Sequence, residues 1–293
     1  MFENFIFQVA VSGSNGQLGR EIAKIANKHP RFHFIFLTRL EFPLDDAGKM
    51  KSWLDVHQIH FFINCAAYTA VDKAETDSEK AFNINAQAPG YIAGLLAEKK
   101  IPLIQLSTDY VFDGTSSQPL TEIAATHPVN KYGASKLEGE KRVLQNNPLS
   151  MIIRTSWLYS EYGNNFVKTM MNLLRTKKSI QVVGDQKGSP TYAGDLAAAI
   201  IRIMEWDYFK AGIYHYSNEG ETTWYEFALE IKRLTGSACE VLPVPSSGYP
   251  TPARRPSYSL MDKSKIKTDY GLTIPDWKTS LAVCIDLLKK QEV

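Results

Sequence analysis

Short apolar runs alternate with helical patterns through the first half of the chain. The apolar runs at 5–11, 32–37 and 59–67 have the length of strands, and the stretches at 20–26 and 49–56 between them carry apolar residues at helical spacing. Strands that alternate with helices predict a parallel sheet whose two faces are covered by helices. The pattern therefore predicts an α/β fold with a doubly wound parallel sheet.

The alternation continues to residue 154 and weakens beyond it. A strand is predicted at 102–107, a helix at 131–145 and another strand at 150–154. The later residues include segments rich in Gly, Pro, Ser and Tyr, a composition typical of ordered loops that shape a pocket. We divide the chain into 1–154 and a smaller lobe at 155–293, and we expect some sheet elements of the second part to cross back to the first.

Composition narrows the class of protein. The 293 residues include 33 Lys and Arg against 31 Asp and Glu, which gives a formal net charge of +2 and leaves no surplus for binding nucleic acid. The three cysteines are too few and too widely spaced for a disulfide framework, and neither a signal peptide nor a membrane span is found in the sequence. These features predict a cytoplasmic protein with neither a nucleic-acid nor a membrane partner, and they permit an enzyme.

A glycine turn follows the first predicted strand. Gly13, Gly16 and Gly19 have the spacing found where a strand turns sharply into a helix whose N-terminus receives a pyrophosphate. The first glycine permits the turn, the second lets phosphate approach the backbone, and the third lets the helix pack on the strand. Residues 1–154 are therefore predicted to be a dinucleotide-binding domain, with 155–293 as a substrate-binding lobe.

The end of the second predicted strand bears on the choice of dinucleotide. An enzyme that prefers NAD usually places a carboxylate there for the ribose hydroxyls, whereas this chain has Thr38 and Arg39, with Asp45 slightly downstream. A guanidinium at this place can pair with the 2′-phosphate of NADP. We predict NADPH as cofactor, with NADH as the alternative and with Arg39 as a solvated loop residue in that case.

A tyrosine and a lysine are the candidates for acid–base chemistry. Tyr132 and Lys136 are four residues apart in a predicted helix, so the phenol and the ammonium can meet on one face. A phenol with a pKa near ~10 needs a neighbouring cation to exchange protons at neutral pH. Thr108, at the end of the fourth predicted strand, can donate a hydrogen bond to a substrate carbonyl oxygen while Tyr132 delivers the proton.

Three motifs carry a family resemblance. They are Ser-Thr-Asp-Tyr-Val-Phe-Asp-Gly at 107–114, Tyr-Gly-x-x-Lys-Leu-x-Gly-Glu at 132–140 and Asn-Cys-Ala-Ala-Tyr-Thr-Ala-Val-Asp-Lys-Ala-Glu at 64–75. In these motifs the chain resembles the extended short-chain dehydrogenases of the dTDP-4-dehydrorhamnose reductase family, which have a Rossmann-like fold. Further blocks in the second half extend the likeness over nearly the whole chain. They are 154–159, 163–166, 185–191, 222–225 and 251–256.

The resemblance implies roles for individual residues. It implies Thr108, Tyr132 and Lys136 as the catalytic set, with Tyr132 and Lys136 also touching the cofactor. The other implied cofactor contacts lie in the glycine turn and after the third predicted strand, and the implied sugar contacts lie after two strands. These residues are Gly16, Gln17 and Leu18 for the pyrophosphate, Ala67, Tyr68 and Thr69 for the adenosine and nicotinamide ribose, and Asp109, Trp157 and Asn165 for the substrate.

Two arginines are candidates for the nucleotide diphosphate. Guanidinium groups match phosphate oxygens, and Arg254 and Arg255 are followed by a proline that stiffens their loop. The competing interpretation is a salt bridge at a domain interface. His57 and His60 lie one helical turn apart without a third ligand nearby, so no metal site is predicted.

The motifs together favour one reaction. We expect NADPH-dependent reduction of the C4 ketone of dTDP-4-dehydro-L-rhamnose, by a monomer or a homodimer. One alternative is another nucleotide-sugar reductase or epimerase. The other is a non-catalytic, NADP-binding regulatory subunit similar to the β subunit of methionine adenosyltransferase, against which the retention of Thr108 argues.

Overall fold

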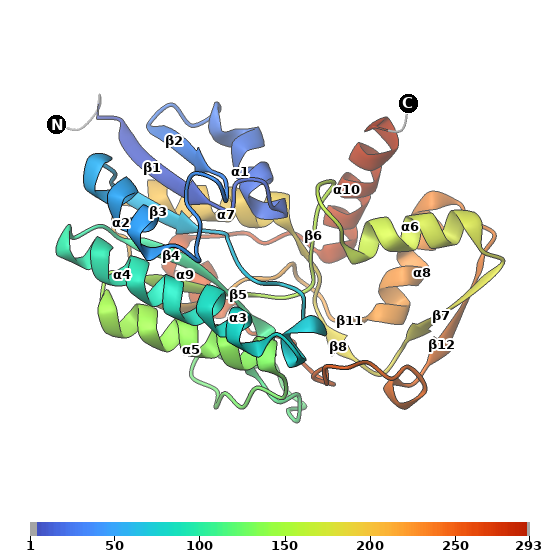
Figure 1. The fold of residues 1–293 in the computed structure, drawn as a ribbon. Helices are drawn as coiled ribbons and strands as arrows, with labels where there is room; N and C mark the ends of the chain where they lie inside the picture. The colour runs from blue at the N-terminus through green and yellow to red at the C-terminus, as the bar shows by residue number, and fades with distance from the viewer. Residues whose placement is uncertain (1–4, 292–293) are drawn as a thin grey trace.

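A six-stranded parallel sheet forms the centre of the larger lobe. The computed structural model describes residues 5–291, and the strands of this sheet follow the order β10-β5-β4-β3-β1-β2 (Figure 1). The middle strands are mostly apolar, and β4 is buried along its whole length, its polar residues included, as expected for a parallel sheet covered on both faces. The strands are β1 (Phe7–Ser12), β2 (Phe32–Leu37), β3 (Phe61–Asn64), β4 (Leu103–Thr108), β5 (Met151–Thr155) and β10 (Gly212–His215).

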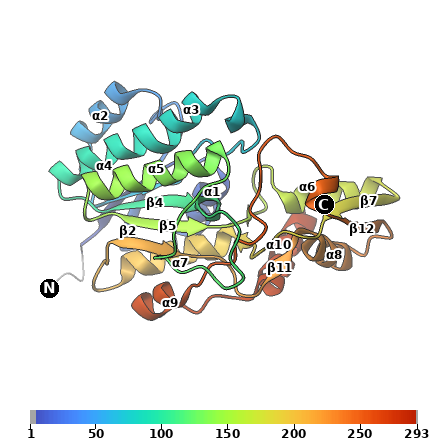
Figure 2. The ribbon, with the colours of Figure 1, turned by 90° about the horizontal axis from the view of Figure 1, so that it is seen from below.

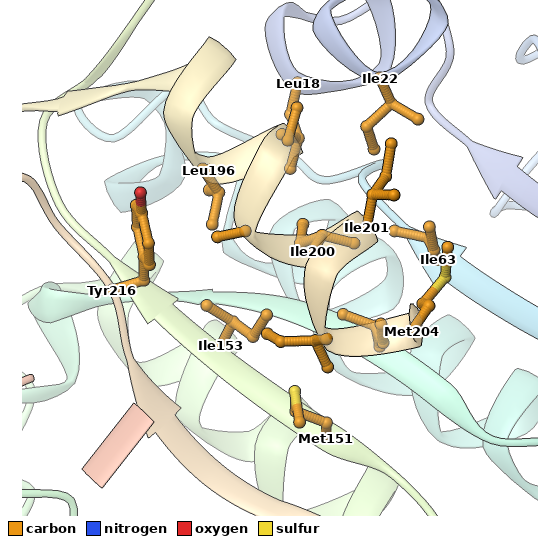
Figure 3. Close-up of a cluster of buried hydrophobic side chains, with 14 of the residues drawn as sticks. Leu18, Ile22, Ile63, Met151, Ile153, Leu196, Ile200, Ile201, Met204 and Tyr216 are labelled. Atoms are coloured by element: carbon orange, nitrogen blue, oxygen red, sulfur yellow. The ribbon is translucent and has the colours of Figure 1, made fainter. Parts of the chain in front are cut away.

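Helices pack on both faces of the sheet, which Figure 2 shows edge-on. On one face lie α1 (Gln17–Ala26), α7 (Ala193–Glu205) and α9 (Ser264–Tyr270), and their apolar side chains share a core with the sheet. In Figure 3, Leu196 and Ile200 of α7 lie between the sheet and Leu18 of α1. The opposite face is covered by α2 (Ala47–Val56), α3 (Ser78–Phe82), α4 (Ala88–Glu98) and α5 (Lys131–Asn146).

The smaller lobe has its own apolar core. Three helices pack there against a two-stranded parallel sheet, and aromatic side chains such as Phe227 and Trp277 lie at the centre. Short strand pairs, β6 with β9 and β8 with β11, join this lobe to the first. The elements are β6 (Leu158–Tyr159), α6 (Phe166–Thr176), β7 (Ser179–Val183), β8 (Lys187–Gly188), β9 (Thr191–Tyr192), β11 (Thr222–Thr223), α8 (Trp224–Thr235), β12 (Glu240–Val244) and α10 (Trp277–Gln291).

The chain passes between the lobes more than once. After β9 it returns to the larger lobe as α7 and β10, and β10 pairs in parallel with β5 through Gly212 and Met151. It then forms α8 and β12 in the smaller lobe and comes back again as α9. The predicted doubly wound parallel sheet with a smaller C-terminal lobe is confirmed.

One predicted strand is shorter than expected. The apolar run 59–67 predicts a strand of nine residues, but β3 spans only Phe61–Asn64. The chain leaves β4 after Asn64 because the amide of Ala66 donates to the side chain of Asn64 instead of to β4. The amide of Cys65 still donates to the Ser12 carbonyl, which continues the pairing with β1 by one residue. The residues after β3 are thereby free to line a site at the end of the sheet.

Candidate active site

The turn between β1 and α1 has room only for glycine at two positions, Gly13 and Gly19. Gly13 has a φ of 70°, and a Cβ there would lie 2.6 Å from the amide nitrogen of Ala66. A Cβ on Gly19 would lie 2.6 Å from the carbonyl oxygen of Gly13. Gly16 is the N-cap of α1 and has no side chain that could accept a hydrogen bond. The first N–H groups of the helix therefore have no capping partner and can donate to a ligand. This cradle fits the pyrophosphate of a dinucleotide.

Two residues of the predicted cofactor site lie beside this turn. The side chain of Leu18 is buried in the core against α7, so only its backbone can face a phosphate (Figure 3). The side chain of Gln17 accepts a hydrogen bond of 2.9 Å from Asn165, which is also the N-cap of α6. A predicted cofactor residue and a predicted substrate residue are thus joined across the two lobes.

The end of β2 holds the predicted determinants of cofactor choice. The guanidinium of Arg39 donates to the carboxylate of Asp45 over 2.7 Å, and both side chains are exposed. Glu41, which the sequence analysis did not single out, accepts hydrogen bonds of 2.8 Å from the amide and the hydroxyl of Thr38. The turn after β2 therefore carries one guanidinium and two carboxylates at the place where the sequence predicts the ribose end of a dinucleotide.

Thr108 and Tyr132 come from neighbouring elements. Thr108 ends β4, and Asn130 caps α5 by accepting from the Gly133 amide, so the helix begins with Tyr132 in its first turn. Burial raises the pKa of Tyr132 to about 12, and an interaction with the Thr108 hydroxyl opposes the rise. The phenol is therefore protonated at neutral pH and can act as a proton donor.

Lys136 lies one turn further along α5 and is buried. Its ammonium donates a hydrogen bond of 2.6 Å to the backbone carbonyl of Leu106 in β4. Burial lowers the pKa of Lys136 to about 8, while the negative charge of Glu140 opposes the decrease. The structure thus brings the predicted catalytic trio to one end of β4 and one face of α5.

Asp109 follows Thr108 and is 2% exposed. Its Oδ1 accepts a hydrogen bond of 3.1 Å from the Thr108 hydroxyl, and burial raises the pKa of the carboxyl to about 6. Its Oδ2 has no hydrogen-bond partner among the described residues. A buried, unpartnered carboxyl oxygen beside Thr108 is consistent with the predicted contact to a sugar hydroxyl.

Trp157 adopts an unusual backbone conformation. Its φ is 48°, in the left-handed region that few bulky residues enter. Its ring stacks on that of Trp224, the first residue of α8, with centroids 3.7 Å apart, and its carbonyl accepts from the Thr191 amide. Packing from the smaller lobe therefore fixes the plane of the predicted sugar-contact residue.

The segment after β3 is held by a buried asparagine. Asn85, in a π-helical turn at Asn83–Gln87, accepts from the amide of Tyr68 and donates to its carbonyl. Ala67 and Tyr68 are half-buried and Thr69 is exposed, so they line the open side of this segment. The amide of Asn85 also donates to Ser135 in α5, which ties the predicted adenosine and ribose contacts to the catalytic helix.

The two candidate arginines differ in their surroundings. Arg255 donates two hydrogen bonds to the carboxylate of Asp72 and packs between the loop after β3 and residues 249–257. Arg254 is exposed and forms no ion pair within residues 5–291. The salt-bridge interpretation thus describes the contacts of Arg255, while Arg254 is the guanidinium with no carboxylate beside it.

Several buried polar residues near the site were missed by sequence reasoning. Glu140 and Arg154 form a buried ion pair, with Arg154 donating two hydrogen bonds of 2.9 and 2.7 Å. Ser107 donates to the same carboxylate. The available signals were polar residues inside a predicted helix and two predicted strands, but a single sequence does not reveal that they meet.

Two further observations bound the site. Within the part of the chain that the structure describes, no His, Cys, Asp or Glu cluster of three could hold a metal ion, and no helix has the length and apolarity to span a membrane. A cavity of about 660 Å³ lies in the smaller lobe between the ends of α6, α8 and α10. None of the predicted site residues lines it, so this cavity is separate from the candidate active site.

Comparisons with known proteins agree with this arrangement. The family described as "RmlD substrate binding domain" matches residues 7–290. A dTDP-4-dehydrorhamnose reductase from Aggregatibacter actinomycetemcomitans is 37% identical over 94% of this chain and 97% of its own length. A dTDP-4-keto-6-deoxy-D-glucose reductase from Streptomyces niveus is 35% identical over 96% of this chain and 98% of its own.

A solved structure shows the same fold with a cofactor. The crystal structure of dTDP-4-dehydrorhamnose reductase from Bacillus anthracis in complex with NADP matches with a TM-score of 0.93 and 34% identity. The match covers 97% of this chain and all of the other. Both kinds of comparison therefore extend over the two lobes rather than over residues 1–154 alone.

Proposed function

Because this chain belongs to the dTDP-4-dehydrorhamnose reductase family, we propose that it reduces the C4 ketone of dTDP-4-dehydro-L-rhamnose to dTDP-L-rhamnose with NADPH. The observation that carries the proposal is the convergence of Thr108, Tyr132 and Lys136 at the end of β4. NADPH supplies the hydride that is added to C4. The glycine turn and the free amides of α1 would hold its pyrophosphate.

The protein's own residues handle the proton. As hydride reaches C4, negative charge develops on the ketone oxygen, and Tyr132 donates a hydrogen bond to it. Thr108 donates a second one, for which its hydroxyl turns from Asp109 to the ketone oxygen. Tyr132 then gives up its proton, which becomes the hydroxyl hydrogen of the product, and the charge of Lys136 stabilises the phenolate that remains. A phenol whose pKa is raised to about 12 by burial carries this proton at neutral pH.

Cofactor and substrate contacts follow from the same geometry. We propose that Arg39 faces the 2′-phosphate of NADPH, and that it exchanges its contact with Asp45 for the phosphate. Asp109, Trp157 and Asn165 are the proposed contacts to the sugar side, and Arg254 is the proposed contact to the diphosphate. The match to an NADP complex supports the choice of NADPH over NADH.

The cellular setting and the assembly are also proposals. Cys65, Cys239 and Cys284 are all free thiols, as is usual in a reducing compartment, which supports a cytoplasmic enzyme. Either a monomer or a homodimer is compatible with the site, because its proposed residues all come from one chain. Light scattering of the purified protein distinguishes the two.

The deciding experiment uses the proposed substrate. NADPH absorbance is followed with enzymatically made dTDP-4-dehydro-L-rhamnose, with NADH in parallel, and the product sugar is identified by NMR. We expect oxidation of NADPH and formation of dTDP-L-rhamnose, and Tyr132→Phe should lower kcat by a factor of about 100 or more while NADPH still binds. No oxidation with either cofactor would contradict the proposal.

A second candidate function rests on one relative. The Streptomyces niveus protein, named for a 4-keto-6-deoxy-D-glucose substrate, is nearly as similar to this chain as the rhamnose enzymes are. A different 4-keto sugar with the same catalytic groups is therefore the main alternative. Faster reduction of dTDP-4-keto-6-deoxy-D-glucose than of the rhamnose precursor would favour it.

A further inference from the structure

A chain of buried hydrogen bonds runs across three strands of the sheet to the lysine of the active site. The hydroxyl of Ser12 in β1 donates to Asn64 in β3 over 2.6 Å, and the amide of Asn64 donates to the side chain of Gln105 in β4 over 2.8 Å. The amide of Gln105 donates to the backbone carbonyl of Leu106 over 2.9 Å. The ammonium of Lys136 donates to that same oxygen over 2.6 Å.

The Leu106 carbonyl is available because β3 ends early. The carbonyl of Pro102, the residue directly before β4, accepts from the amide of Phe62 in β3. Carbonyls an even number of residues apart point the same way along a strand. The Leu106 carbonyl therefore faces β3 and would accept from Ala66 if β3 continued. The Ala66 amide instead donates to the side chain of Asn64 over 3.2 Å.

The hydrogen bonds of this series fix the orientation of both side-chain amides. The Oδ1 atom of Asn64 accepts from Ser12 and Ala66, so its amide nitrogen must point at Gln105. The Oε1 atom of Gln105 accepts from Asn64, so its own amide nitrogen must point at Leu106. The side chains of Ser12, Asn64 and Gln105 are at most 3% exposed, so water does not replace a lost partner readily.

We propose that Gln105 is a positioning residue for Lys136. Its side-chain amide donates to one side of the Leu106 carbonyl and leaves only the other side for the ammonium of Lys136. This inference rests on the proposed function, in which Lys136 must reach Tyr132 one turn away on α5. Asn64 and Ser12 act through Gln105 by fixing the direction of its amide. None of the three needs to touch the cofactor or the sugar for this role.

The ammonium has few other neighbours that could set its place. The titratable groups that act on it are Glu140 on α5 and Cys65 after β3, and Tyr132 lies one turn away on the same helix. Glu140 is bound by the guanidinium of Arg154 and by Ser107, and burial raises the pKa of the Cys65 thiol to about 12, so it is uncharged at neutral pH. The Leu106 carbonyl is the acceptor within hydrogen-bonding distance of Lys136 in the described structure.

The test changes Gln105 and measures Lys136 directly. In Gln105→Met the side chain keeps its length but loses both hydrogen bonds, so the carbonyl is left to the ammonium alone and Lys136 is drawn away from Tyr132. We expect kcat to fall about tenfold, with the alkaline limb of its pH profile moved upward, because a more distant cation stabilises the phenolate less. NMR titration of the Lys136 side chain should show a higher pKa than in the parent, because the ammonium then has the carbonyl to itself.

A second variant keeps the inference testable if the first does not fold. Gln105→Glu can still accept from Asn64, but its carboxylate cannot donate to Leu106 and attracts the ammonium instead. The variant should be nearly inactive at pH 8 and regain activity as the pH falls and the new carboxyl becomes protonated. A variant that is merely destabilised would not regain activity on protonation of residue 105, so this recovery distinguishes a positioning role from general destabilisation.

Asn147 provides the matched control. It is a fully buried amide at the other end of α5, and it donates to the backbone carbonyl of Ile101 over 3.0 Å. Asn147→Leu should lower stability without moving the alkaline limb of the pH profile or the Lys136 titration.

The inference is overturned if the Gln105 variants keep the parental pH profile and titration, or if Asn147→Leu shifts them equally. An inactive parent with a shifted Lys136 titration in Gln105→Met would instead count against the proposed substrate.

Discussion

The guanidinium of Arg255 and the carboxylate of Asp72 form a two-point ion pair, with N–O distances of 2.9 and 2.8 Å. Asp72 also accepts from the amide of Ala253, so it holds the loop of residues 249–257 at two places. Asp72 lies four residues after Tyr68, in the segment proposed to contact the cofactor. The pair therefore ties a loop of the second half of the chain to the cofactor side of the site.

Loosening this tie should weaken substrate binding more than it slows chemistry. Both side chains are partly exposed, so the pair contributes at most about 1 kcal/mol, and Arg255→Met should raise the KM for the nucleotide sugar by up to about fivefold. The value of kcat should change little. Steady-state kinetics at two salt concentrations measure both constants.

Arg254→Met tests the neighbouring arginine separately. If Arg254 binds the diphosphate, its KM effect should shrink as salt rises, while the stability of the protein stays at the parental value. Equal and salt-independent effects for Arg254→Met and Arg255→Met would show that neither contacts phosphate directly.

Gly19→Ala should abolish the fit of the cofactor turn. The added methyl group would lie 2.6 Å from backbone atoms of Gly13 and Ser14, so the turn must shift. We expect NADPH to bind at least about tenfold more weakly, which corresponds to about 1.4 kcal/mol. Fluorescence titration with NADPH measures the affinity.

Gly94→Ala is the control for the glycine prediction. Gly94 lies in α4, and nothing lies within 4 Å of the position of its Cβ. Since alanine is favoured over glycine in helices, the variant should gain about 0.5–1 kcal/mol of stability with unchanged NADPH binding. A loss of binding in both variants would indicate that the assay reports general damage.

The stability of the protein should depend on pH through the ionisation of Asp109. Burial raises the pKa of this carboxyl in the folded protein to about 6, above the ordinary value for Asp, so its ionisation opposes folding. Its favourable contribution is complete below the pKa of the unfolded chain and is lost as the pH rises through about 6. Asp109→Asn should therefore be more stable than the parent at pH 8, by up to about 3 kcal/mol, and similar to it near pH 4. Denaturant unfolding at both pH values measures the difference.

Asp113 gives the opposite sign in the same experiment. Hydrogen bonds from the amide and hydroxyl of Thr115 lower the pKa of Asp113, so its ionised form favours folding. Asp113→Asn should lose a little stability at pH 8 and none well below the ordinary pKa of Asp. The Asp109 interpretation fails if both variants show the same sign at pH 8.

The buried pair of Glu140 and Arg154 should be costly to break from one side. Both side chains are at most 3% exposed, so Glu140→Gln leaves a guanidinium buried without its counter-charge. We expect a loss of about 3–5 kcal/mol in the free energy of unfolding. The double variant with Arg154→Met should lose less than Glu140→Gln alone, and a larger loss in the double variant would contradict the argument.

Much of the larger lobe could be predicted because its signals are local. The apolar run 32–37 coincides with β2, and the predicted helix 131–145 differs from α5 by one residue at its end. The spacing of Tyr132 and Lys136 puts them on one helical face whatever the rest of the fold does. Thr108 joins them because the carboxyl ends of parallel strands meet at one edge of the sheet.

The parts that could not be predicted depend on contacts between distant residues. The apolar run 59–67 does not reveal that β3 ends at Asn64, because a side chain of that residue diverts the next amide. Arg254 and Arg255 are adjacent arginines that the sequence alone does not distinguish. Only Arg255 pairs with Asp72, which lies more than 180 residues earlier in the chain. The stacking of Trp157 on Trp224 likewise joins two segments with no shared pattern.

The hydrogen-bond acceptor of Lys136 is a main-chain oxygen, and this has an evolutionary consequence. A substitution at Leu106 changes a side chain but leaves the oxygen in place, so no single replacement there deletes the acceptor. The acceptor would disappear if β3 were one pairing longer, since the Ala66 amide would then take it. The acceptor of the lysine is therefore set by the register of the sheet, and relatives should vary at position 106 only among apolar side chains that fit the core, as long as β3 keeps its length.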